Sequence, residues 1–162
     1  MPVTDVRKDL DALTMTMTAE FDAAPARVWQ VWKDPRQLER WWGPPTYPAT
    51  VTEHELVPGG KVAYFMTGPE GDRHHGWWVV RAVESPYRLE FEDGFADEGG
   101  AVNDALPVTA TTVTLADREG GGTVMTVTAT FPSREDLDRL LAMGVEEGLR
   151  SALAQVDGIL AA

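Results

Sequence analysis

The chain has 162 residues, no cysteine, and 26 acidic against 14 basic side chains, which gives a formal net charge of -12. This length predicts one domain whose core is large enough to fold without disulfides or a structural metal. The acidic balance argues against nucleic-acid binding, because phosphate neutralisation needs clustered lysine and arginine. The absence of cysteine excludes thiol nucleophiles and cysteine-based zinc sites.

The N-terminal segment has no apolar core of signal-peptide length, and no stretch approaches the roughly 18 consecutive apolar residues of a membrane span. We therefore expect a cytoplasmic protein without membrane insertion. Residues 1–12 are expected to form an N-terminal extension and residues 13–162 a single domain. The short motifs of zinc proteases, serine hydrolases and phosphate-binding loops are absent from the sequence.

The first predicted strand covers residues 13–22, where apolar and polar side chains alternate. Two short helices are predicted between Asp22 and Pro45, because apolar residues recur there at helical spacing and Pro35 divides the segment. Strand patterns bounded by glycine and proline turns then follow. Six further antiparallel strands are expected, near residues 50–56, 61–67, 75–83, 87–92, 109–116 and 123–131.

The C-terminal segment predicts one long helix that begins after Ser133, the expected N-cap, and runs nearly to residue 162. At 1.5 Å per residue such a helix is roughly 40 Å long and crosses the concave face of a curved sheet. The predicted fold class is therefore α+β, with the sheet wrapped around this helix.

Three small residues, Gly144, Gly148 and Ala152, lie four positions apart on the apolar stripe of that helix. A helical glycine costs about 1 kcal/mol relative to alanine, so something offsets the cost. Two explanations stay open. The helix packs closely against the sheet at these positions, or the missing side chains leave a void that accepts a ligand.

His54 and Tyr64 are the catalytic candidates, because strand alternation places them on faces expected to meet the helix. A histidine has a pKa of about 6.5 and acts as a base near neutrality, with the tyrosine as acid or oxyanion donor. The alternative for His54 is a hydrogen-bonded structural imidazole. His74 and His75 are expected to be solvated, and adjacent strand positions face opposite ways, so no metal site is predicted.

A glycine- and aspartate-rich stretch, residues 93–103, is expected to be a loop. Its paired carboxylates offer acid-base chemistry in principle, but a charge-dense loop is normally solvated, so we expect no catalytic role for them. The acidic residues in and beside this stretch are Glu92, Asp93, Asp97 and Glu98.

Several short motifs follow one another in a recognisable order: residues 21–25, 41–44, 58–60 and 68–71, Pro86 with Arg88 and Leu89, residues 131–133, and Gly144 to Gly148. Together they resemble the family of activator of heat-shock protein 90 ATPase homologues, within the START-like, Bet v 1-like superfamily also called SRPBCC. The resemblance extends over roughly residues 13 to 160.

This resemblance implies a helix-grip fold with a hydrophobic cavity between the sheet and the C-terminal helix. Two residues depart from the family pattern: Leu149 stands where tryptophan is common, and His54 stands where an apolar residue is common. The first change is expected to enlarge the pocket or to open its mouth, and the second to add a titratable group to an apolar lining. The superfamily includes lipid carriers, hormone receptors, cyclases and co-chaperones, so the fold alone does not fix the function.

The leading hypothesis is a cofactor-free, non-enzymatic protein that binds a small hydrophobic molecule, aromatic or polyketide-like, in this cavity. The alternatives are a cyclase- or hydrolase-type enzyme in the same cavity, and a co-chaperone-like interaction module. Only about a dozen residues precede the first predicted strand, which argues against a complete chaperone activator. The predicted lining residues are Trp32, Trp42, His54, Tyr64, Met66, Trp78, Phe91, Gly148, Leu149 and Ala152.

Two points stay open at this stage. A monomer and a weak homodimer through an aromatic patch near Trp41 are both compatible with the sequence. Strand alternation also places only one of Trp77 and Trp78 on the cavity face, without indicating which.

Overall fold

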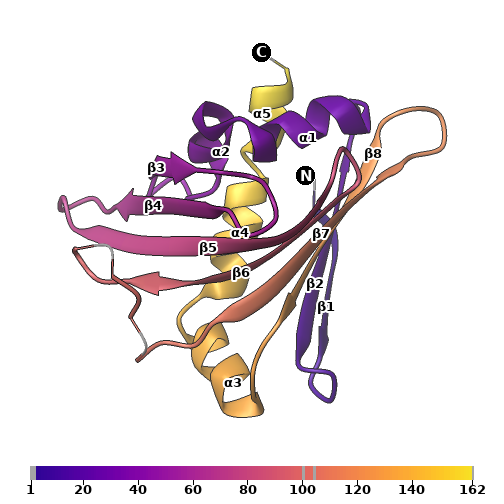
Figure 1. The fold of residues 1–162 in the computed structure, drawn as a ribbon. Coiled ribbons are helices and arrows are strands. Elements are labelled where there is room, and N and C mark those ends of the chain that lie inside the picture. Colours follow the sequence, from indigo (N-terminus) through magenta and orange to yellow (C-terminus); the bar gives the residue numbers. More distant parts are fainter. Residues whose placement is uncertain (1–2, 100, 104, 162) are drawn as a thin grey trace.

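The structure, a computed structural model, describes residues 3–99, 101–103 and 105–161. Eight antiparallel strands form one curved sheet in the order β1-β2-β8-β7-β6-β5-β4-β3, and the C-terminal helices lie along one side of it (Figure 1). The predicted α+β helix-grip fold is confirmed. The strands are β1 (Val3–Asp9), β2 (Thr14–Phe21), β3 (Ala49–His54), β4 (Lys61–Thr67), β5 (Arg73–Glu84), β6 (Arg88–Ala96), β7 (Thr109–Asp117) and β8 (Thr123–Thr130).

The strand β1 lies in the segment that the sequence analysis describes as an N-terminal extension. It pairs with β2 at the edge of the sheet, so the first predicted strand is the second strand of the fold. Most side chains of β1 are exposed, and only Val3 and Val6 break the polar run. A charged edge strand of this kind carries too little apolar alternation to be predicted from its sequence.

The two predicted short helices are present as α1 (Pro25–Lys33) and α2 (Pro35–Trp41). A proline begins each helix, where the missing N–H costs nothing. Asp34 ends α1 and caps α2, since its carboxylate accepts a hydrogen bond from the Arg36 amide at 2.9 Å. Both helices lie at one end of the sheet, beside β3 and α5 (Figure 1).

The C-terminal segment is helical as predicted, but it is divided into α3 (Arg134–Ala142), α4 (Val145–Leu153) and α5 (Val156–Leu160) rather than continuous. Ser133 is the N-cap, and its Oγ accepts from the Asp136 amide at 3.1 Å. The break between α3 and α4 lies at Gly144, whose φ of 88° is left-handed and ends a helix. The three helices follow one course behind the sheet (Figure 1).

The strand β6 runs to Ala96, beyond its predicted end at Glu92, so the expectation of a loop from residue 93 was wrong for residues 93–96. Backbone pairing extends the strand: Asp93 lies opposite Trp78 of β5 and Thr109 of β7. Pairing with β5, joined at Asp93 by pairing with β7, outweighs the poor strand propensity of aspartate and glycine. This extension places Asp93 within the sheet.

The core is centred on aromatic side chains from α1, α2 and the adjoining strands. Trp32 meets Trp41 edge-on with ring centroids 4.7 Å apart, and Trp78 stacks on Phe91 with centroids 3.9 Å apart. All four side chains are fully buried. Aromatic pairs in these geometries add to the stability gained by burial alone.

A candidate ligand cavity between the sheet and the C-terminal helices

A cavity of about 500 Å³ lies between the inner face of the sheet and the segment from the end of α3 through α4. Its walls are mainly apolar and aromatic, which is typical of small-molecule sites. Met143 stands at its rim and is 53% exposed. The lining residues are Met15, Trp42, Pro44, Tyr47, Tyr64, Met66, His74, Asp93, Gly94, Phe95, Thr109, Thr111, Val127, Ala129, Phe131, Met143, Gly144, Val145, Gly148 and Leu149.

The three small residues of the helical stripe have three different roles. A Cβ placed on Gly148 would meet no atom within 4 Å, so close packing does not explain this glycine. Gly148 faces the cavity, which favours the void over the close-packing explanation at this position. Gly144 provides the left-handed turn between two helices, and Ala152 is buried in the core away from the cavity lining.

The predicted lining set is divided by the structure. Five of its members line the cavity: Trp42, Tyr64, Met66, Gly148 and Leu149. Four others belong to the packed core outside this lining: Trp32, Trp78, Phe91 and Ala152. Trp77 does not line the cavity either. Its ring covers Gly94, and its Nε1 donates a hydrogen bond to the Phe95 carbonyl at 3.0 Å.

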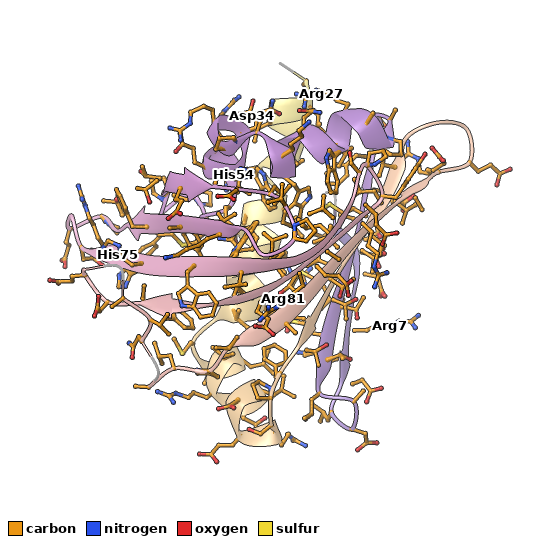
Figure 2. All side chains as sticks on the ribbon, in the orientation of Figure 1. Arg7, Arg27, Asp34, His54, His75 and Arg81 are labelled. Carbon is orange, nitrogen blue, oxygen red and sulfur yellow. The ribbon has the colours of Figure 1, made fainter. Side chains whose placement is uncertain are left out.

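His54, the remaining candidate, lies beside α1 rather than on the cavity (Figure 2). Its Nε2 donates to the Trp32 carbonyl at 3.0 Å, which satisfies one of the free carbonyls at the end of α1. A register shift between Val51 and Glu53 turns His54 toward this helix. The structure therefore does not bring His54 and Tyr64 together around one cavity, and the imidazole proton has a structural partner.

Asp93, expected in a solvated acidic loop, lies instead in the wall of the cavity. Its half-buried side chain lines the cavity, and its Oδ1 accepts a hydrogen bond from Thr111 Oγ1 at 3.2 Å. Burial raises the pKa of the Asp93 carboxyl to about 7, because the surrounding protein solvates the charged form poorly. Alternation from Leu89 and Phe91 would have identified this residue if the strand had been extended past residue 92.

Tyr64 reaches across the neighbouring strand, and its hydroxyl lies over Gly76, where any side chain would collide with the phenol. Burial, and next the negative charge of Asp93, raise the pKa of the Tyr64 hydroxyl. The indole N–H groups of Trp42 and Trp78 lie near this hydroxyl and oppose that rise. Neither N–H reaches hydrogen-bond geometry with any partner in the described part of the chain.

The histidines do not form a metal site. His74 stands at the cavity rim, where its Nε2 lies 2.6 Å from Asp72 Oδ2, and this contact with the histidine lowers the pKa of Asp72. His54 and His75 come from separate parts of the sheet (Figure 2). Across residues 3–99, 101–103 and 105–161, no group of three potential ligands is placed to hold a metal ion.

Known proteins resemble this chain in sequence and fold. The model of the family described as Activator of Hsp90 ATPase homolog 1-like protein matches residues 22–161. None of the curated proteins matches the chain. Within the described residues, no helix is both long and apolar enough to cross a membrane.

Solved structures agree with the family match. A crystal structure from Mycobacterium smegmatis is 52% identical, with a TM-score of 0.91 over 98% of this chain and 97% of that one. A solution structure from Arthrobacter aurescens is 53% identical, with a TM-score of 0.94 over 98% and 92% of the two chains. The AHSA1 protein of Silicibacter pomeroyi, 20% identical with a TM-score of 0.73 over 91% and 97%, shares the fold.

Proposed function

The chain belongs to the Activator of Hsp90 ATPase homolog 1-like family, and from this premise we propose that it binds a small hydrophobic molecule in the cavity between the sheet and α4. Folds of this kind commonly bind hydrophobic ligands. The observation that carries the proposal is the open space at Gly148. This glycine faces the cavity from α4, and a Cβ placed on it would meet no atom within 4 Å.

Three further features support the proposal. The volume of about 500 Å³ is in the range of sites for drug-sized ligands. The walls offer aromatic and aliphatic surface together with a few polar groups, among them Asp93, Thr111 and the Tyr64 hydroxyl. Met143, exposed at the rim, gives an apolar ligand a contact on its way in. We take residues 13–162 as the binding domain.

The proposal assigns no chemical step to the cavity. His54, the base in the enzyme hypothesis, donates its Nε2 proton to the end of α1 and lies outside the cavity lining. A catalytic base must reach the proton that it removes from a bound substrate. We therefore favour ligand binding or transport over turnover.

The experiment fills the cavity and leaves the fold unchanged. Gly148→Leu places a branched side chain in the open space of the cavity, whereas Gly158→Leu makes the same change at an exposed helical position with equally open surroundings. Both changes replace a helical glycine with a better helix former, so both proteins should fold. Binding of the apolar fluorophore N-phenyl-1-naphthylamine is measured by its fluorescence enhancement, and native mass spectrometry detects molecules that copurify.

We expect the unchanged protein and Gly158→Leu to bind the fluorophore with equal affinity. Gly148→Leu should bind it at least about ten-fold more weakly, because the leucine occupies space that the ligand needs. Equal binding by all three proteins would show that the fluorophore binds elsewhere. Absence of binding by the unchanged protein, together with no copurifying molecule, would refute the proposed function.

A further inference from the structure

Asp93 brings a carboxyl group into a mainly apolar cavity, and no lysine or arginine among the described lining residues balances its charge. Its one hydrogen bond within the described residues comes from the neutral Thr111 hydroxyl. Lysine and arginine are absent from the cavity lining in this part of the chain. A carboxylate taken out of water without a positive partner is unfavourable, so the ionised form of Asp93 is uncompensated by this lining.

Among the residues that the structure describes, no other element lining the cavity supplies the missing charge. The helical wall contributes only Gly144, Val145, Gly148 and Leu149 beside the rim residue Met143. The other titratable lining residues are Tyr47, Tyr64 and His74. A tyrosine side chain carries no positive charge, and His74 is already paired with Asp72 at the rim. A positive charge next to Asp93 must therefore come from the ligand.

The aromatic side chains of the lining suit such a charge. Trp42, Tyr47, Tyr64 and Phe95 contribute rings to the same cavity as Asp93. The faces of aromatic rings attract cations through their negative electrostatic potential, and this attraction increases where water is excluded. Carboxylate and rings together form surroundings that favour an ammonium group over a neutral polar group of the same size.

We propose that the cavity selects an apolar amine, whose ammonium group pairs with the Asp93 carboxylate while its hydrocarbon or aromatic body fills the space beside Gly148. This inference rests on the proposed function and names the ligand class. The pairing forms no covalent bond. It favours the ionised form of Asp93 and so opposes burial, which raises the pKa of that carboxyl to about 7.

The test compares two ligands of the same shape, 2-naphthylmethylamine and 2-naphthalenemethanol, at pH 8 and 0.15 M salt, where the amine is protonated. Dissociation constants are measured by calorimetry for the unchanged protein, Asp93→Asn and Asp117→Asn. Asp117 is an exposed aspartate of β7, so its change removes one surface charge and leaves the cavity intact. This control matters because a chain of net charge -12 attracts any cation weakly.

We expect the amine to bind the unchanged protein and Asp117→Asn at least about ten-fold more tightly than the alcohol, as a charge-assisted hydrogen bond implies. Asp93→Asn should lose this preference and bind the two ligands equally. An amine that binds no more tightly than the alcohol, or a preference that persists in Asp93→Asn, overturns the inference. The amine inference can fail while the proposed function stands, provided that N-phenyl-1-naphthylamine still binds and that Gly148→Leu weakens its binding. If the fluorophore does not bind in this way, the amine inference and the proposed function both fail.

Discussion

Replacing Asp93 by asparagine should stabilise the protein at alkaline pH. Burial raises the pKa of this carboxyl to about 7 in the folded protein, against 3.8 for an unperturbed aspartate. Below pH 3.8 the group is protonated in the folded and unfolded states and costs nothing. Between the two pKa values the unfolded chain gives up the proton first, so stability is lost as the pH rises, and the loss is complete above about pH 7.

The magnitude follows from the separation of the two pKa values. Each pH unit between them costs about 1.4 kcal/mol, which sets a ceiling of about 4 kcal/mol above pH 7. Two effects reduce the gain below this ceiling. The carboxyl is only half-buried, and the asparagine adds an amide N–H₂ that also needs hydrogen-bond partners. We therefore expect Asp93→Asn to raise the free energy of unfolding by about 2 kcal/mol. The Thr111 hydroxyl keeps an acceptor in this variant, because the asparagine carbonyl replaces the carboxylate oxygen.

Urea unfolding of the unchanged protein, Asp93→Asn and Asp117→Asn at pH 8 and pH 4.5 measures this effect. The stabilisation by Asp93→Asn should appear at pH 8 and fall to less than about 1 kcal/mol at pH 4.5, with no comparable gain for Asp117→Asn. A variant that is equally stabilised at both pH values, or destabilised at pH 8, would refute the argument that burial of an unpaired carboxyl dominates.

Three further substitutions test individual features of the fold by urea unfolding. His54→Ala should lower the free energy of unfolding by about 1 kcal/mol, because the hydrogen bond to the Trp32 carbonyl is lost. The affinity for N-phenyl-1-naphthylamine should stay unchanged, and weaker binding of the fluorophore would place His54 at the site. Gly144→Ala should destabilise by about 1 kcal/mol, because its φ of 88° disfavours a side chain. Gly148→Ala should instead stabilise by about 1 kcal/mol as a helical position with open space, and the opposite order for these two glycines would contradict the roles assigned to them.

Much of the fold was predictable because its signals are local. Alternation identified β2, Pro35 marked the division between α1 and α2, and Ser133 marked the start of α3. Each of these signals acts within a few residues of the element that it predicts. The family resemblance, confirmed over residues 22–161, then gave the arrangement of these elements in space.

The missed features depend on contacts between distant parts of the chain. The strand β1 forms because β2 offers an edge, and β6 extends past Glu92 because it continues to pair with β5. The break at Gly144 was hidden because the apolar stripe continues across it at helical spacing. Such pairings and turns are decided by tertiary structure rather than by local propensity.

The site was predicted in part for the same reason. Trp42, Tyr64 and Gly148 were found because periodicity assigns each to an inward face. Periodicity does not separate a side chain that lines a void from one that packs in the core, and Trp32 and Trp78 belong to the core. The distinction between these two groups depends on where α4 stands away from the sheet.

The central claim is that a ligand occupies this cavity, and the methionine methyl groups report on it directly. Met15, Met66 and Met143 line the cavity, whereas Met17 and Met125 are buried in the core outside its lining. A titration of methyl-labelled protein with N-phenyl-1-naphthylamine, followed by NMR, should shift the signals of the first three at one shared dissociation constant and leave the other two nearly unchanged. Shifts confined to Met17 and Met125, or no saturable shift at the cavity methyls while the fluorophore binds, would contradict the account.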